Sequence, residues 1–215
     1  KNPPLKETTY SNPAYTLIAY LVERFAGTPY KRYMQKTIFD PLEMRDLAFH
    51  PRPDMDERLA VPYLYSAGSG HTPALRNKAD VWPAGIVYGT IETQANWLIM
   101  NLNGGEFNGT RILKEETLNE AMTPQFPDFK PKLSLNWTGD ADTYGLTWWL
   151  GERNGERYFA HSGSVNGYTA FIEGNRPRRL GCAILSNGHR AHPHLIRLSA
   201  KAIALLAEQG YGDAP

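Results

Sequence analysis

The chain contains a single cysteine, Cys182, among its 215 residues, so no disulfide can form within it. It has no apolar run near the roughly 20 residues of a membrane-spanning helix. Its first residues, Lys1-Asn2-Pro3-Pro4, do not resemble a signal peptide. It also lacks an excess of charge: 23 Lys and Arg face 22 Asp and Glu, which argues against nucleic acid or an anionic membrane as a partner. The composition, 41% hydrophobic and 21% charged, is that of a globular protein with one sizeable core.

Hydrophobic periodicity divides the chain into a helical part and a strand part. Helical spacing predicts helices over residues 13–25, 29–37, 91–103 and 115–122. Strand patterns follow at Tyr144–Leu150, Tyr158–His161, Tyr168–Glu173 and Leu180–Ser186, before a last helix at Pro193–Glu208. We therefore expect an α/β (α+β) fold in which helices flank an antiparallel sheet. Residues 1–140 would form a helical and loop-rich region, and residues 141–215 the sheet and C-terminal helix of the same domain.

Two Asn-Gly pairs predict tight turns within the strand part. Asn154-Gly155 and Asn166-Gly167 each separate two predicted strands, as this dipeptide does in hairpins. Trp148 and Trp149 are adjacent on a strand and would therefore point to opposite faces. One indole would enter the core, and the other is a candidate for lining a pocket.

The segment over residues 51–83 carries many Pro, Gly and Ser and few periodic residues. This composition predicts a long loop of the kind that lines binding sites. Tyr63, Tyr65 and His71 within it are candidates for the rim of a substrate site.

Two groups of reactive side chains have simple structural explanations. Cys182 stands in an apolar run with no His and acid arrangement around it, which predicts a buried strand residue and not a nucleophile. His189, His192 and His194 are dense enough to suggest a metal site, but they lack a carboxylate partner and enclose Pro193. A solvated turn at the start of a helix is the simpler interpretation.

A polar signature, His161-Ser162-Gly163-Ser164, ends the second predicted strand. Glycine at the end of a strand lets a ligand or another backbone approach closely, and it frees the Ser164 amide to point at a substrate oxygen. The alternative is that these residues only end a strand in a turn. His161-Ser162-Gly163 alone favour the turn.

A second polar signature, Tyr10-Ser11-Asn12, precedes the first helix. Ser11 or Asn12 would cap that helix, which Pro13 would begin and Gly27 would end. Capping explains both polar residues without any function. The functional alternative is that the Tyr10 phenol acts as a general base once a nearby cation lowers its pKa, while the Asn12 amide holds a substrate amide or ester group.

Taken in this order, the two signatures resemble the Tyr-x-Asn and the Lys-Thr-Gly or His-x-Gly elements of the serine β-lactamase-related hydrolases. The resemblance is to the penicillin-binding-protein-like branch of class C β-lactamases, esterases and D-peptidases, and it runs nearly end to end. The strings that carry it are Tyr10-Ser11-Asn12-Pro13-Ala14-Tyr15, Ile38-Phe39-Asp40-Pro41-Leu42-Glu43-Met44, Trp82-Pro83-Ala84-Gly85-Ile86, Asn103-Gly104-Gly105, Arg111-Ile112-Leu113, Met122-Thr123-Pro124-Gln125, Tyr144-Gly145-Leu146-Thr147-Trp148-Trp149 and His161-Ser162-Gly163-Ser164-Val165-Asn166-Gly167-Tyr168.

The resemblance implies a β-lactamase/transpeptidase-like fold and acyl transfer to water through an acyl-enzyme, with no metal or organic cofactor. Tyr10 would move the proton, His161 would stabilise the charge network or assist Tyr10, and the Ser164 N–H would be an oxyanion donor. Asn12 and Ser162 would orient a small-molecule or peptide substrate. The resemblance also favours a periplasmic or secreted location. The implied site residues are Tyr10, His161 and Ser164 for catalysis and Asn12, Ser162 and Gly163 for substrate binding.

Two departures from the family pattern qualify the expected activity. No Ser-x-x-Lys occurs in the sequence; in the family this nucleophile pair lies upstream of Tyr-x-Asn. Thr28 and Lys31 have the spacing, but Thr28-Pro29 is typical of a helix cap and first turn. His161-Ser162-Gly163 replaces the Lys-Thr-Gly of the β-lactamases, which favours ester or peptide substrates over β-lactams.

We therefore expect part of a serine hydrolase that is inactive alone. Its nucleophile would come from an N-terminal segment outside this chain, possibly a separate polypeptide. Without that segment the sheet should show an open edge and the helices some uncovered apolar surface. The alternative is a non-catalytic binding or scaffold protein that keeps a β-lactamase-like cleft.

Overall fold

A computed structural model of the chain describes residues 10–75, 83–85, 87–125 and 140–212. Its helices are α1 (Asn12–Ala26), α2 (Tyr30–Met34), α3 (Ile91–Leu102), α4 (Glu115–Ala121) and α6 (His192–Glu208), with a π-helical turn η1 (Gln35–Phe39) and a 3₁₀ helix η2 (Pro53–Arg58). Its strands are β1 (Tyr63–Ser66), β2 (Gly70–Pro73), β3 (Glu106–Phe107), β4 (Thr110–Arg111), β5 (Thr143–Tyr144), β6 (Trp149–Arg153), β7 (Glu156–Val165), β8 (Tyr168–Asn175) and β9 (Leu180–Ser186).

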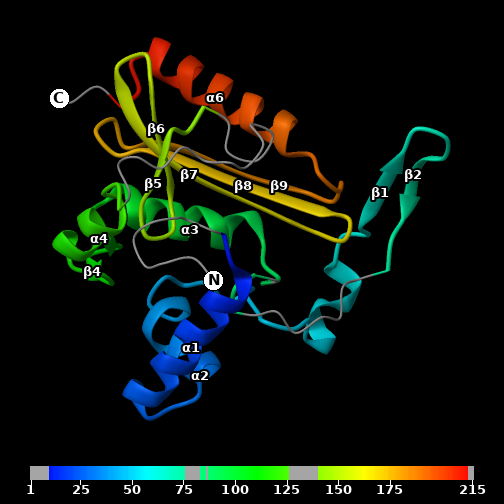
Figure 1. Cartoon of the computed structure of the whole chain (residues 1–215), viewed down its shortest axis with the longest axis horizontal. Helices are drawn as coiled ribbons and strands as arrows, with labels where there is room; N and C mark the ends of the chain where they lie inside the picture. The colour runs from blue at the N-terminus through cyan, green and yellow to red at the C-terminus, as the bar shows by residue number, and fades with distance from the viewer. Residues whose placement is uncertain (1–9, 76–82, 86, 126–139, 213–215) are drawn as a thin grey trace.

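The centre of the molecule is a five-stranded antiparallel sheet in the order β5-β6-β7-β8-β9. Each strand pairs with its neighbour in the chain, so the sheet is a meander. Helix α6 covers one face and α3 the other, both packing on β8 and β9 (Figure 1). The expected antiparallel sheet flanked by helices is confirmed.

Each face of the sheet has its own hydrophobic cluster. Trp149, Tyr158 and Phe171 pack with Leu195 and Ile196 of α6. On the other face, Trp148, Phe159 and Ile172 form a cluster with Leu98 of α3. Trp148 and Trp149 do point to opposite faces, as expected for adjacent strand residues. Both indoles are buried, at 5% and 4% exposure, so the expectation that one of them lines a pocket was wrong.

Both Asn-Gly turns are present. Asn154 and Gly155 have φ values of 54° and 78° between β6 and β7, as a type I′ hairpin turn requires. Asn166 and Gly167 join β7 to β8. Gly167 has a φ of 82°, and a Cβ there would lie 2.3 Å from the Cβ of Pro62, so the fold itself requires this glycine.

The predicted strand at Tyr144–Leu150 is interrupted. Gly145 donates its N–H to the Trp148 carbonyl, which closes a turn between β5 and β6. A Cβ at Gly145 would lie 2.2 Å from the Ala121 carbonyl oxygen, so only glycine lets α4 approach so closely. In contrast, β7 extends well past the predicted Tyr158–His161.

The first helix follows its sequence signals. Ser11 caps α1 by accepting a hydrogen bond from the Ala14 N–H at 3.3 Å, Pro13 lies in the first turn, and Gly27 ends the helix at a φ of 63°. Asn12 is therefore the first helical residue and not the cap. The second helix differs from its prediction, because after Met34 it continues as the π-helical turn η1.

The segment predicted as a long loop contains regular structure, so that prediction was wrong. It forms η2 and the hairpin β1–β2, which projects from the end of the sheet (Figure 1). The base of the hairpin is fixed to the sheet: Tyr63 donates its N–H to the Asn187 carbonyl, and its carbonyl accepts from the His189 N–H, both at 2.9 Å. Residues 76–82, including Trp82 of the string at 82–86, and Ile86 lie outside the described residues.

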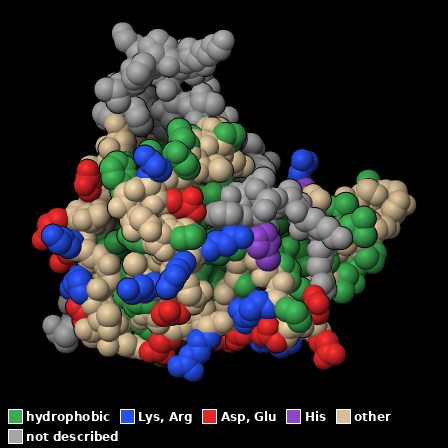
Figure 2. Space-filling view, turned by 90° about the horizontal axis from the view of Figure 1, so that it is seen from below, with side chains coloured by type: hydrophobic (Ala, Val, Ile, Leu, Met, Phe, Trp, Pro, Cys, Tyr) green, Lys and Arg blue, Asp and Glu red, His purple; other side chains and the backbone are tan. Residues whose placement is uncertain are grey.

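The surface shows no segregation of charge on the face seen from below. Basic and acidic side chains are interspersed there, and apolar side chains gather on the projecting hairpin (Figure 2). Within the described ranges, no helix is long and apolar enough to cross a membrane.

Candidate active site

The hydrogen-bonding pattern of β7 leaves the Ser164 amide facing away from β8. Two residues join these strands, so the flanking pair Val165 and Tyr168 is a hydrogen-bonded pair. Such pairs alternate in antiparallel sheets, so the Ser164 and Thr169 pair is not hydrogen-bonded. On the other side, β6 pairs with β7 only as far as Ala160. The Ser164 N–H therefore points to an edge with no strand beside it among the described residues.

Among the described residues, nothing requires a glycine at position 163. Its φ is outside the left-handed region, and a Cβ built on it would meet no atom of those residues within 4 Å. Glycine inside a strand costs roughly 0.5–1 kcal/mol relative to alanine. Position 163 is exposed and lies between His161 and the outward Ser164 amide. A glycine that packing does not demand indicates close approach by a ligand or by another backbone.

Tyr10 belongs to a cluster of three tyrosines. The Tyr15 hydroxyl donates to the Leu146 carbonyl at 2.7 Å, which fixes α1 against the β5–β6 turn. The pKa of Tyr144 is raised, first by burial, then by a hydrogen bond with Tyr15 and by the nearby phenols of Tyr15 and Tyr10. Tyr10 itself is 46% exposed. Its pKa is raised, first by burial and then by Tyr15, which is opposite to the direction that a general base requires.

Aromatic contacts continue from this cluster to the His-Ser-Gly signature. The rings of Tyr144 and Trp149 have their centroids 4.4 Å apart, and Trp149 stacks on His161 at 6.5 Å. Tyr144 is near enough to Tyr10 to feel its charge, so Tyr10 and His161, which are 151 positions apart, are both close to this pair of aromatic side chains. The two signatures lie on the same part of the molecule.

His161 is a neutral side chain at pH 7. Loss of hydration lowers its pKa to about 4, only partly offset by a hydrogen bond to the Ser162 backbone. An uncharged imidazole can donate or accept a hydrogen bond, but it supplies no positive charge to Tyr10.

The two predicted substrate-orienting residues differ in accessibility. The Asn12 side chain is exposed, and within the described residues it makes no hydrogen bond. Ser162 is buried at 8% exposure and shares a strand face with Tyr158 and Ala160, which pack toward α6. Its backbone, more than its hydroxyl, faces the open edge of β7.

The Ser164 side chain is engaged behind the strand. Its hydroxyl donates to the Tyr168 carbonyl at 3.0 Å and accepts from the Arg190 N–H at 3.3 Å. The His189 Nδ1 also lies 3.3 Å from this hydroxyl. A serine beside a histidine suggests a nucleophile and its base. Here the hydroxyl proton is already directed at a carbonyl, which leaves the Ser164 backbone as the part available to a substrate.

The interpretation of the three histidines as a solvated turn was wrong for His192, which is 2% exposed at the start of α6. His189 does lie in the turn, but it is half-buried and contacts Ser164. His194 is exposed and contacts Arg197. Sequence reasoning missed these roles because nothing local places residues 189–192 behind β7. Among the described residues, no group of His, Cys, Asp or Glu is arranged to hold a metal ion. Burial raises the pKa of the Cys182 thiol, which makes it a poor nucleophile.

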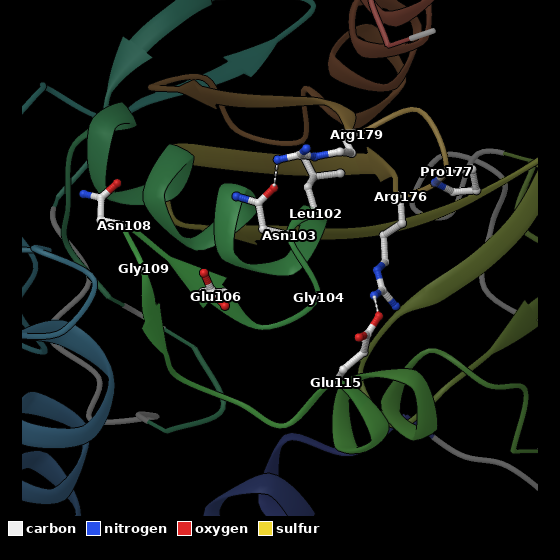
Figure 3. Close-up of a pocket in the computed structure, with 10 residues that line it drawn as sticks. All are labelled: Leu102, Asn103, Gly104, Glu106, Asn108, Gly109, Glu115, Arg176, Pro177 and Arg179. Atoms are coloured by element: carbon white, nitrogen blue, oxygen red, sulfur yellow. Dashed lines mark hydrogen bonds and ion pairs between the residues drawn. The ribbon is translucent and has the colours of Figure 1, made fainter. Parts of the chain in front are cut away.

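One open pocket of about 730 Å³ lies away from both signatures (Figure 3). It is formed by the end of α3, the β3–β4 hairpin, the start of α4 and the β8–β9 turn. Its arginines already have partners: Arg176 pairs with Glu115, and Arg179 donates to the Asn103 side chain. The pocket contains none of the predicted site residues, so we place the candidate site at β7.

The family model described as Beta-lactamase matches residues 1–206. A human beta-lactamase-like protein is 28% identical over 182 residues, which is 84% of this chain and 34% of that protein. The D-alanyl-D-alanine-carboxypeptidase/endopeptidase AmpH of Escherichia coli K12 is 27% identical over 148 residues, 69% of this chain and 36% of AmpH. The chain thus spans about a third of the length of these curated relatives.

Solved structures show the same fold. The octameric penicillin-binding protein homologue from Pyrococcus abyssi superposes with a TM-score of 0.81 at 24% identity, over 97% of this chain and 44% of that one. D-amino acid amidase from Ochrobactrum anthropi gives a TM-score of 0.75 at 19% identity, over 95% of this chain and 59% of that one. With the family model matching nearly the whole sequence, this chain belongs to the beta-lactamase family.

Proposed function

We propose that this chain forms one wall of the active site of a serine hydrolase that transfers an acyl group to water. The nucleophilic Ser and its Lys would come from an N-terminal segment outside these 215 residues, in the same polypeptide or as a separate chain. The Ser164 N–H is one oxyanion donor, Tyr10 moves the proton between nucleophile and leaving group, and Asn12 and Ser162 orient the substrate.

The single observation that carries this proposal is the open space at Gly163 beside the outward Ser164 amide. A tetrahedral oxyanion needs an N–H donor within about 3 Å, and that donor must not be covered by a side chain. A strand glycine that the described packing does not require, next to an amide that the sheet does not use, offers an uncovered donor of this kind.

The raised pKa of Tyr10 supports a proposal in which a cation from outside this chain lies beside its phenol. For the Tyr10 phenol to accept a proton near neutral pH, a positive charge has to lower its pKa. Among the described residues burial raises that pKa, and the nearby His161 is neutral. The lysine that in the family accompanies the nucleophile would supply this charge.

Two exposed surfaces support an additional segment of the same protein. Strand β9 ends the sheet, and among the described residues it pairs only with β8, although its sequence, LGCAILS, carries no charge or proline to protect an edge. Helix α1 exposes a set of large apolar side chains: Leu17, Ile18, Tyr20, Leu21 and Phe25, the last at 89%. Open edges and apolar helix faces of this size are usually covered in a folded protein.

The substrate class follows from the residue at position 161 and from the relatives. A neutral His161 replaces the lysine of the β-lactamases, so recognition of an anionic β-lactam loses a cation. AmpH is named for D-alanyl-D-alanine cleavage and the Ochrobactrum enzyme for D-amino acid amides. We therefore favour an ester, amide or D-amino-acid peptide as the substrate of this site.

The test compares the purified 215-residue chain with the same chain plus the segment encoded upstream, joined or as a second polypeptide. We expect the chain alone to be inactive and the pair to hydrolyse an activated ester such as p-nitrophenyl acetate. A fluorophosphonate probe should label the upstream serine, and intact mass should place the adduct on that segment. Tyr10→Phe in the pair should slow turnover by at least about a hundredfold.

Two outcomes contradict the proposal. Turnover by the isolated chain that Tyr10→Phe abolishes would place a nucleophile within these residues. A folded but inactive pair that no probe labels would favour the alternative of a non-catalytic binding or scaffold protein with the same cleft.

A further inference from the structure

His192 lies directly behind the Gly163–Ser164 peptide. It is the first residue of α6, it is 2% exposed, and its ring hydrogen-bonds the Gly163 backbone. His192 lies outside the sequence segments that carry the family resemblance. This buried imidazole therefore contacts the same peptide unit that carries the candidate oxyanion donor, the Ser164 N–H.

The direction of this hydrogen bond follows from its effect on the ring. The bond favours the protonated imidazole, so the ring N–H donates and the Gly163 carbonyl accepts. That carbonyl belongs to the peptide unit whose N–H is the Ser164 amide. By the alternation of the β7–β8 ladder this carbonyl faces β8, and the His192 ring N–H is a second donor to it. In a trans peptide the carbonyl and the N–H point in opposite directions, so the Ser164 N–H points to the open edge of β7.

The start of α6 is itself held firmly against the strands. The Thr169 hydroxyl donates to the Gly188 carbonyl at 2.6 Å and accepts from the Ala191 N–H at 3.0 Å. The Ser164 hydroxyl accepts from the Arg190 N–H on the same loop. These contacts leave the His192 ring little freedom to move relative to β7.

We propose that His192 is a positioning residue of the candidate site: its ring N–H holds the Gly163 carbonyl, so that the Ser164 N–H stays directed at the open edge of β7. This inference rests on the proposed function only for its catalytic consequence. Hydrogen bonds on the two ends of one peptide strengthen each other, so the Ser164 amide also becomes a better donor. A stronger donor stabilises the charged oxyanion of the transition state more than the uncharged substrate. The contribution of His192 should therefore appear in kcat and not in KM.

The experiment uses the whole protein, with the upstream segment present. His192→Phe removes the donor, whereas His192→Asn and His192→Gln each keep an N–H near one ring nitrogen. His194→Phe, on the same helix but exposed, is the matched control. The measurements are kcat and KM for an activated ester, the affinity of a boronic acid that mimics the oxyanion, the melting temperature, and the ¹⁵N–¹H signal of Ser164.

We expect His192→Phe to lower kcat by about tenfold or more with KM within about threefold, and to weaken boronate binding by a similar factor. At least one of the Asn and Gln variants should recover most of the loss, and His194→Phe should change nothing. The Ser164 amide signal should shift in His192→Phe and return toward its original position in the rescuing variant.

A folded His192→Phe variant with normal kcat, normal boronate affinity and an unmoved Ser164 signal would overturn the positioning role. A loss of activity that only follows the loss of folded protein, with no rescue by Asn or Gln, would overturn it as well. If the wild-type protein has no hydrolase activity, the proposed function fails, and the Ser164 signal alone then decides whether His192 holds this peptide.

Discussion

The indole of Trp149 and the imidazole of His161 lie nearly parallel, with ring centroids 6.5 Å apart and an angle of 23° between their planes. Trp149 is almost completely buried and packs on Tyr144, so it forms a fixed wall against which the imidazole rests. The wall replaces water on one side of the ring. Burial, to which this contact contributes, lowers the pKa of His161 to about 4, so the ring is uncharged at pH 7.

The pH dependence of stability should report this environment. The pKa of His161 is about 4 in the folded chain and about 6.5 when unfolded, so between these values the unfolded state binds more protons. The contribution of His161 to stability is therefore complete above pH 6.5 and is lost as the pH falls toward 4. The loss amounts to at most about 3 kcal/mol.

His161→Gln should accordingly flatten the decrease in unfolding free energy between pH 6.5 and 4, measured by urea unfolding. His71→Gln in the exposed hairpin is the control and should leave the slope as in the wild type. An equal slope in wild type and His161→Gln would mean that the ring is hydrated in the folded chain.

Gly163 and Gly167, four residues apart, should respond oppositely to alanine. The methyl group of Gly163→Ala enters open space, so the free energy of unfolding should stay constant or rise by up to about 1 kcal/mol. The same methyl group should hinder the substrate, so ester turnover of the complete protein should fall at least about tenfold. Gly167→Ala should destabilise by more than about 1 kcal/mol, because its positive φ and its contact with Pro62 exclude a side chain. Unchanged turnover in Gly163→Ala would remove the main support for the site.

The parts of the fold that the sequence predicted depend on local chemistry. The Ser11 cap, the Gly27 stop and the Asn154-Gly155 turn each involve groups within a few residues of one another. The Asn166-Gly167 turn sets which amides of β7 face away from β8. The role of the Ser164 N–H as an oxyanion donor was predicted from the neighbouring glycine and the family resemblance, and it stays a prediction.

The parts that were missed depend on contacts between distant segments. The turn at Gly145 exists because α4 approaches it through Ala121, 24 residues earlier. The burial of His192 requires the loop after β9 to fold against the β7–β8 turn. The hairpin β1–β2 is anchored by Asn187 and His189, more than 120 residues later. No local pattern in the sequence contains these neighbours.

Tyr10 is expected to matter for turnover and little for folding. Its side chain is nearly half exposed, so Tyr10→Phe should leave the melting temperature almost unchanged while kcat of the complete protein falls by at least about a hundredfold. Tyr15→Phe loses the hydrogen bond to Leu146 and should cost about 1 kcal/mol of stability. Tyr20→Phe, exposed on the same helix, is the control and should change neither quantity. Normal kcat in Tyr10→Phe would show that another group moves the proton.

The buried carboxylate of Glu173 should be the most sensitive charged position for stability. It is 1% exposed, pairs with Arg153 at 2.5 Å, and accepts from the Ser199 hydroxyl at 3.0 Å. Glu173→Ala removes one of the two carboxylates that pair with Arg153, which keeps Asp140, and leaves the Ser199 hydroxyl without its acceptor, so we expect a loss of about 1–3 kcal/mol in urea unfolding. Asp46→Asn, in the exposed pair with Arg58, should have little effect. A loss under about 1 kcal/mol in Glu173→Ala would mean that water reaches the site.

Ser164→Ala separates the two readings of this residue. The hydroxyl donates to the Tyr168 carbonyl and accepts from the Arg190 N–H, so its removal should cost about 1 kcal/mol of stability, while the backbone N–H stays in place. Turnover of the complete protein should therefore remain within about threefold of the wild type. Ser186→Ala, which removes a hydroxyl that accepts from the Gly188 N–H on the same loop, is the matched control.

The contrary result would be a folded Ser164→Ala variant that has lost turnover by several orders of magnitude together with labelling by a fluorophosphonate. Ser164 and His189 would then be the nucleophile and its base, and no upstream serine would be needed.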